Sequence, residues 1–302
     1  MLEIYLLRRA ILTGLFSLVF VVSACDTGGT LTTDADTQAD RDTVDAMSRE
    51  HANDSTSPSE AAKIEPAQSV DSETLAYAEV NDELVYGYLA YPSGVTEPLP
   101  AIVMIHEWWG LNDNIRAMAN RLAAEGYMVL AVDLYQGETA ANPGVARVKM
   151  LQVVENPDRA RENLRQAVRF LNIAGAPGIA SLGWCFGGGW SLNTAMSFPG
   201  ELDATVIYYG QVTADEGKLA AIDAPLLGFF GAVDRGITVE TVNAFESALQ
   251  RLRKQHEIHI YPGVGHAFAN PTGNNYNEEA AEDAWQRTLE FLAENLPQTD
   301  QT

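Results

Sequence analysis

Between residues 100 and 296, short apolar segments alternate with longer segments whose apolar residues recur at helical spacing. Strands that alternate with helices are joined by crossovers into a mostly parallel, doubly wound sheet with helices on both faces. The sequence therefore predicts an α/β domain whose chemistry lies at the carboxyl ends of the strands. The expected strands are 100–106, 127–132, 179–183, 204–209, 225–231 and 257–261, and the expected helices are 115–124, 144–155, 158–173, 187–197, 239–254 and 278–296.

The chain before this alternation divides into a hairpin and an acidic segment. Residues 75–80 and 84–91 flank the polar pair Asn81-Asp82, which is typical of a β-hairpin. Residues 26–75 carry twelve acidic and three basic side chains and almost no large apolar ones, so they have little surface to bury. We therefore expect a disordered acidic tether over 25–75, followed by a single domain over 76–302.

The N-terminus has the features of an export signal. Arg8 and Arg9 precede an uncharged run over 10–24, which is too short to span a membrane but has the length of a signal's apolar core. The run ends at Ala24 and is followed by Cys25, which resembles the lipoprotein signal of bacteria. That resemblance implies a signal peptide over 1–24, a lipid on Cys25 and a location anchored to the membrane on the periplasmic side. The alternative is a plain signal anchor with an incidental cysteine.

Composition and motifs exclude several classes of protein. A net charge of -22 argues against a nucleic-acid groove, which needs clustered cations. The chain has neither the glycine fingerprint of dinucleotide-binding proteins nor the lysine of a P-loop, so no cofactor is expected. His256 and His259 lie three positions apart on an expected strand, which puts them on opposite faces, so no metal site is expected from them.

The pentapeptide Gly183-Trp184-Cys185-Phe186-Gly187 lies between an expected strand and an expected helix. This is the setting of the G-x-S-x-G nucleophile elbow, with Cys in place of Ser. A side chain at either glycine would collide with the neighbouring strand or helix, and the helix N-terminus favours a thiolate. If Cys25 carries lipid, Cys185 is the only thiol left. A lone cysteine is nevertheless more often a small buried apolar residue.

Two further residues follow the cysteine in the order found in α/β hydrolases. Asp234 follows an expected strand, and His266 lies in a glycine-rich loop after the next one. This order of nucleophile, acid and histidine predicts a Cys-Asp-His triad. The alternatives are that Asp234 caps a turn and that His266 is satisfied within its loop.

Four motifs together resemble the dienelactone hydrolase family over most of residues 76–302. They are His106-Glu107-Trp108-Trp109-Gly110, Asp133-Leu134-Tyr135, the glycine-rich run at 183–188, and His266-Ala267-Phe268. The resemblance implies the α/β-hydrolase fold, a triad of Cys185, Asp234 and His266, and a carboxyl group, Glu107, facing the thiol. It also implies an oxyanion hole formed by the backbone N–H groups of Trp108 and Phe186.

The same resemblance suggests which residues contact substrate. Trp109, Tyr135 and Phe268 belong to the motifs and indicate an apolar pocket, although aromatic residues beside such turns often only pack in the core. Asn270 occupies a place where relatives that take dienelactone carry an arginine, so an anionic lactone would lose a charge-assisted bond of about 1.5 to 3 kcal/mol. Arg147 is the nearest candidate for a second substrate-binding arginine.

We therefore predict hydrolysis of carboxylic esters or lactones through a cysteine thiolate, in a protein that needs no cofactor and acts as a monomer. Glu107 is expected to raise the thiol pKa and protect the resting enzyme from oxidation, or else to be a structural carboxyl group. One alternative is a catalytically silent ligand-binding domain on the hydrolase scaffold. Another is a thioesterase or a peptidase, although residues 76–302 leave no room for the extra domain of peptidases with this fold.

Overall fold

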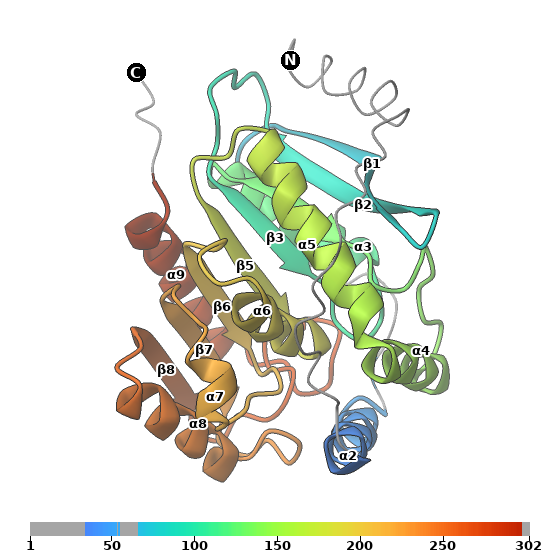
Figure 1. The fold of residues 1–302 in the computed structure, drawn as a ribbon, viewed down its shortest axis with the longest axis vertical. Coiled ribbons are helices and arrows are strands. Elements are labelled where there is room, and N and C mark those ends of the chain that lie inside the picture. Colours follow the sequence, from blue (N-terminus) through green and yellow to red (C-terminus); the bar gives the residue numbers. More distant parts are fainter. Residues whose placement is uncertain (1–33, 53, 55–65, 298–302) are drawn as a thin grey trace, which may run out of the picture.

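A computed structural model of the protein describes residues 34–52, 54 and 66–297, which contain one eight-stranded sheet with helices packed around it (Figure 1). The strand order is β1-β2-β4-β3-β5-β6-β7-β8. β1 and β2 pair antiparallel, β2 pairs antiparallel with β4, and the six strands from β4 to β8 are parallel. The strands are β1 Val70–Val80, β2 Glu83–Pro92, β3 Ala101–Ile105, β4 Met128–Val132, β5 Ile179–Trp184, β6 Ala204–Tyr208, β7 Leu226–Gly231 and β8 His256–Tyr261.

The central strands are buried on both faces. Every residue of β3, β4, β5, β6 and β7 is buried, and successive side chains of a strand point to opposite faces. Helices therefore cover the sheet on both sides, as the sequence predicted. α5 lies across the near face in Figure 1, where it contacts β1, β3 and β4, while α9 contacts β6 and β7.

The larger helices begin where the sequence places caps. Asn112 caps α3 and Asn142 caps α4, each accepting a hydrogen bond from a backbone N–H of the first turn. α5 begins with Pro157 at its first position. The helices are α2 Asp34–Glu50, α3 Asp113–Ala124, α4 Pro143–Glu155, α5 Pro157–Ile173, α6 Phe186–Ser197, α7 Glu216–Leu219, α8 Val239–Arg251 and α9 Glu278–Asn295. The sequence predicted all of these except α2 and the single turn α7.

The predicted hairpin is present, and it is longer than expected. Asn81 and Asp82 form its turn with φ angles of 54° and 62°, the left-handed region that Asn and Asp tolerate best after glycine. β1 begins at Val70, so residues 70–75 belong to the sheet and not to a tether. The prediction of a disordered segment up to residue 75 is wrong for these residues.

The same prediction is wrong for residues 34–50, which form helix α2 beside α4 (Figure 1). The reason is that α2 has one buried face, which the overall composition of the segment does not reveal. Val44 and Met47 lie one turn apart on the helix and His51 follows one turn later, and all three are buried. Three buried side chains on one face are enough to dock a short helix on a neighbour, even in a segment that is otherwise polar.

The predicted signal peptide over 1–24 and the lipid attachment site Cys25 lie outside the described residues. Within the described ranges, none of the helices is long and apolar enough to cross a membrane.

Candidate active site

Cys185 lies at a sharp turn between β5 and α6. Its backbone has a φ of 55° and a ψ of -119°, and its side chain is fully buried. A Cβ on Gly183 would lie 2.2 Å from the carbonyl oxygen of Gly187, and a Cβ on Gly187 would lie 2.2 Å from that of Ile105. Only glycine fits at both positions, so the turn has the geometry that the G-x-C-x-G spacing predicted.

Three side chains from different strand ends form a chain of contacts. His266 Nε2 lies 3.3 Å from the Cys185 sulfur, and His266 Nδ1 donates to Asp234 Oδ2 at 2.7 Å. All three residues are buried. The structure thus brings together the cysteine, histidine and aspartate predicted from their order along the chain. Their contacts have the geometry of a nucleophile, a base and a group that orients the base.

Asp234 is held as a carboxylate. Its Oδ1 accepts hydrogen bonds from the backbone N–H groups of Gly236 at 2.8 Å and Ile237 at 2.9 Å. Burial by itself would raise the pKa of Asp234, but the charge and hydrogen bond of His266 and the two amides lower it below its usual range. An ionised Asp234 keeps the proton of His266 on Nδ1 and turns Nε2 toward the thiol.

The electrostatics at the thiol favour a thiolate. Burial opposes ionisation, but the positive charges of His266 and His51 outweigh it and lower the pKa of Cys185 to about 6. Burial likewise lowers the pKa of His266, but the charges of Cys185 and Asp234 raise it well above its usual value. The resting site is therefore an ion pair of thiolate and imidazolium near neutral pH.

Glu107 follows β3, and its carboxyl group accepts a hydrogen bond from the Asn270 side-chain amide at 2.8 Å. Burial, followed by the charge of Cys185, raises the pKa of Glu107 to about 8. At neutral pH the group is mostly protonated and carries no charge that could repel a thiolate. The role expected from the sequence, in which the charge of Glu107 keeps the thiol protonated, stays a prediction. Asn270 binds Glu107, and its predicted contact with substrate stays a prediction.

The two backbone amides predicted for the oxyanion hole lie at the loops that flank the thiol. Phe186 is the first residue of α6, where a backbone N–H has no partner within the helix. Trp108 lies in the turn after β3, and within the described residues its N–H donates to no other backbone group. In the described part of the chain neither amide donates to another backbone group, and their catalytic role stays a prediction.

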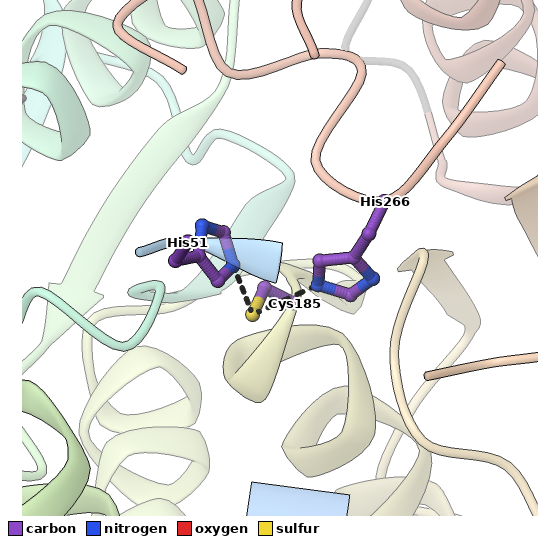
Figure 2. A group of neighbouring side chains, drawn as sticks. All are labelled: His51, Cys185 and His266. Atoms are coloured by element: carbon purple, nitrogen blue, oxygen red, sulfur yellow. Dashed lines mark hydrogen bonds between the residues drawn. The ribbon is translucent and has the colours of Figure 1, made fainter. Parts of the chain in front are cut away.

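Residues of the N-terminal segment also reach the thiol, which sequence reasoning missed. His51 Nε2 lies 3.4 Å from the Cys185 sulfur, which it approaches from a different direction than His266 (Figure 2), and Met47 Sδ lies 3.8 Å from the same sulfur. The His51 ring stacks on Trp108 with ring centroids 4.7 Å apart. The thiol, both imidazoles and the Trp108 ring are fully buried. Residues 44–52 and 54, called segment 44–54 below, therefore cover the nucleophile.

Asp54 orients His51 much as Asp234 orients His266. His51 Nδ1 donates to Asp54 Oδ2 at 2.6 Å, and Asp54 Oδ1 accepts from the backbone N–H of Asn274 at 3.2 Å. Burial lowers the pKa of His51, but the charge of Cys185 and the hydrogen bond to Asp54 raise it to about 9. The spacing His51-x-x-Asp54, which begins four residues after the apolar Met47, was the only signal in the sequence for this second pair.

The remaining predicted substrate residues lie in different surroundings. Tyr135 packs against Phe186 with ring centroids 5.6 Å apart, and Trp109 packs against Trp108 at 4.8 Å. Phe268 is fully buried against Tyr209 and Tyr261. Arg147 on α4 pairs with Asp45 of α2 at 2.6 Å. The contacts of these four residues with substrate stay predictions.

Comparison with known proteins identifies the family. The sequence model of the dienelactone hydrolase family matches residues 85–296. The chain belongs to the dienelactone hydrolase family. A relative from Saccharolobus solfataricus, named as a carboxymethylenebutenolidase, is 33% identical over an alignment of 245 positions that covers 69% of this chain and 93% of the relative. One of the same name from Escherichia coli is 31% identical over 224 residues, covering 68% of this chain and 80% of the relative.

Solved structures agree with this assignment. A dienelactone hydrolase from Klebsiella pneumoniae superposes with a TM-score of 0.68 at 27% identity, covering 75% of this chain and 99% of that one. An esterase from Thermogutta terrifontis, at 17% identity and a TM-score of 0.59 over 76% of this chain and 96% of that one, shares the fold. The chain has the α/β-hydrolase fold and is an ester or lactone hydrolase of the dienelactone hydrolase family.

Proposed function

We propose that this hydrolase uses Cys185 as its nucleophile, with His266 as the base and Asp234 as the group that orients it. The observation that carries the proposal is the unbroken chain of short contacts from Asp234 through His266 to the sulfur at the elbow. A low thiol pKa supports it, because the thiolate is the reactive form.

The reaction would run in two halves. The Cys185 thiolate attacks the carbonyl carbon of an ester or lactone, and the backbone N–H groups of Trp108 and Phe186 stabilise the oxyanion. The tetrahedral intermediate collapses to a thioester on Cys185, and His266 gives a proton to the leaving alkoxide. His266 then takes a proton from water, which attacks the thioester and releases the carboxylic acid and the thiolate.

Neutral or weakly polar acyl groups are the favoured substrates. Tyr135, Phe186 and the Trp108–Trp109 pair surround the elbow with aromatic surface. Asn270 is neutral and already binds Glu107, so it supplies no positive charge for a substrate carboxylate. We therefore propose that simple carboxylic esters are cleaved in preference to an anionic dienelactone.

The test is hydrolysis of p-nitrophenyl acetate and butyrate by the full chain in the presence of a chelator. Cys185→Ala is expected to abolish activity, and Asp234→Asn to lower kcat/KM by about two to four orders of magnitude, since an amide misorients the imidazole. Asp283→Asn serves as the matched control, because Asp283 pairs with Arg287 on α9.

Because segment 44–54 covers the sulfur, the same assays are repeated with Met47→Asp, which is expected to displace that segment. Full activity in Cys185→Ala would refute the thiol mechanism. Folded Met47→Asp protein without any ester hydrolysis would favour the alternative of a silent binding domain.

We also propose that the protein is a lipoprotein anchored through Cys25 on the periplasmic side of a bacterial membrane. Arg8, Arg9, the apolar run at 10–24 and Cys25 itself support this proposal. Radiolabelled palmitate is expected to label the wild type and not Cys25→Ser, and fractionation should place the wild type with membranes. Equal labelling of both proteins would contradict the lipid attachment.

A further inference from the structure

Three electron-pair donors from distant parts of the chain converge on one point in the site. They are His51 Nε2, Cys185 Sγ and His266 Nε2, which all lie within 4.8 Å of one another in fully buried side chains. Figure 2 shows the sulfur between the two imidazoles, with each Nε2 turned toward it. In the described part of the chain, no other group of three His, Cys, Asp or Glu side chains brings its donor atoms together in this way.

Ester hydrolysis by Cys185 needs only one of these imidazoles. His266, held by Asp234, is sufficient as the base, whereas His51 belongs to the N-terminal segment and is a second imidazole beside the sulfur. Each imidazole donates from Nδ1 to a carboxylate, so in its neutral form each presents a lone pair at Nε2. Two nitrogen lone pairs and a thiolate that face one another repel, so protons or a metal ion must lie between them.

We propose that His51, Cys185 and His266 form a binding site for a thiophilic divalent metal ion of the Zn²⁺ class. Thiolate and imidazole are the ligands that Zn²⁺ prefers, and oxygen-seeking ions such as Mg²⁺ and Ca²⁺ do not suit them. The ion would replace the protons of the thiol and of the two Nε2 atoms, which leave to solvent as it binds.

The spacing of the donors fits such an ion. Zn–S bonds of about 2.3 Å and Zn–N bonds of about 2.0 Å at a tetrahedral angle put sulfur and nitrogen roughly 3.5 Å apart. The two sulfur–nitrogen distances here are 3.4 Å to His51 and 3.3 Å to His266. All three donor atoms lie within 4.8 Å of one another, so a single ion placed among them is within reach of each.

The surroundings of the ligands are also those of a metal site. Histidines that bind metals almost always donate their other ring nitrogen to a carboxylate or carbonyl, which fixes the ring and strengthens the donor. Asp54 serves His51 and Asp234 serves His266 in this way. Both carboxylates are nearly inaccessible, with 4% and 0% of their side chains exposed, and they add negative charge near the cation.

Metal binding would lock the N-terminal segment over the nucleophile. His51 follows α2, whereas Cys185 and His266 belong to the hydrolase domain, so an ion shared among them ties the two together. The metal-bound sulfur is unavailable for attack on an ester. The site would thus make hydrolysis sensitive to the local concentration of Zn²⁺.

The experiment is a titration of the metal-free full chain with Co²⁺ and then with Zn²⁺. One equivalent of Co²⁺ should produce a sulfur-to-cobalt charge-transfer band in the near ultraviolet, and Zn²⁺ should displace it. His51→Ala should weaken the binding of both ions by at least about tenfold, and Asp54→Asn should weaken it less. His256→Ala is the matched control, because His256 lies on β8 and binds the Lys254 carbonyl.

Two results would overturn the inference. One is the absence of the charge-transfer band in folded wild-type protein, and the other is equal affinity in wild type and His51→Ala. Ester hydrolysis, measured in chelator, is a separate readout. A protein that binds Co²⁺ through Cys185 but cleaves no ester supports the metal site and contradicts the thiol hydrolase. A protein that cleaves esters equally well with and without Zn²⁺, and shows no charge-transfer band, supports the thiol hydrolase and contradicts the metal site.

Discussion

At the scale of single residues, the partners of each buried group decide how it ionises. Asp234 and Glu107 are both buried carboxyl groups, yet their pKa values move in opposite directions. Asp234 faces an imidazolium and two backbone amides, so its charged form is stabilised. Glu107 is buried without such partners and lies near the charge of Cys185, so its neutral form is favoured. Residue type alone therefore does not assign the role of either group.

Glu107→Gln is expected to change how stability depends on pH. A carboxyl whose pKa is raised by folding binds a proton in the folded state over a range where the unfolded state does not. Its contribution to stability is present below the unfolded value of about 4.3 and is lost as pH rises toward the folded value of about 8. Glutamine does not titrate and still accepts the hydrogen bond of Asn270. As pH rises through this window, the unfolding free energy of the variant should therefore increase relative to that of the wild type by up to about 1.4 kcal/mol per pH unit.

Urea unfolding of both proteins in chelator at pH 5 and pH 8 measures this gain. The neighbouring groups Cys185, His51, Asp54 and His266 are present in both proteins, so their titration cancels in the comparison to first order. A difference in unfolding free energy that is the same at both pH values would show that Glu107 does not titrate in this range.

At the scale of elements, the elbow depends on close approach of backbones. Gly187→Ala places a Cβ 2.2 Å from the carbonyl oxygen of Ile105 on β3, and neither backbone can yield without moving the sheet. We expect a loss of about 3 kcal/mol or more in unfolding free energy. Gly189→Ala is the control on the same helix, because its Cβ would meet the nearest atom of Gln211 at 3.3 Å and alanine favours a helix. Equal stability of the two variants would contradict this account.

Helix α2 is expected to control access to the thiol. Met47→Asp puts a charge into a fully buried site beside the Cys185 sulfur, so the docked state of the segment is disfavoured. We expect iodoacetamide, in the presence of chelator, to alkylate Cys185 at least about tenfold faster than in the wild type. Arg49→Ala, on the exposed face of the same helix, should react at the wild-type rate. An unchanged rate in Met47→Asp would mean that the segment does not protect the thiol.

The alternation of elements and the elbow could be predicted because their signals are local. The local sequence is enough to predict the tight turn at Gly183 and Gly187 and the apolar strands around it. The docking of α2 could not be predicted, because Val44, Met47 and His51 are too few for a periodic signal in an acidic segment. Their burial depends on residues more than a hundred positions later, such as Cys185, which contacts both Met47 and His51. Glu107 shows the same limit, since its pKa depends on burial and on neighbours that the sequence does not place together.

At the scale of the whole molecule, the sheet and the N-terminal segment are stabilised by different amounts of buried apolar surface. The central strands have every residue buried and share one core. The segment adds two buried apolar side chains, Val44 and Met47, worth about 1.5 to 3 kcal/mol each at most. Its ion pairs, Arg147–Asp45 and Arg41–Glu155, are substantially exposed and contribute little.

Amide hydrogen exchange of the metal-free full chain should therefore separate two levels of stability. Amides of α2 are expected to exchange through local undocking, at least about 100-fold faster than those of β3 and β5, which open only on global unfolding. The ordering follows from burial, since β3 and β5 lie in the middle of an eight-stranded sheet and α2 packs on α4 at its border. Adding Zn²⁺ should slow exchange in α2 and around His51 while leaving the strands unchanged, because the ion joins these two parts. Protection of α2 equal to that of β3 without metal would mean that the segment unfolds only together with the sheet, and the thiol would then be exposed no more often than the core itself.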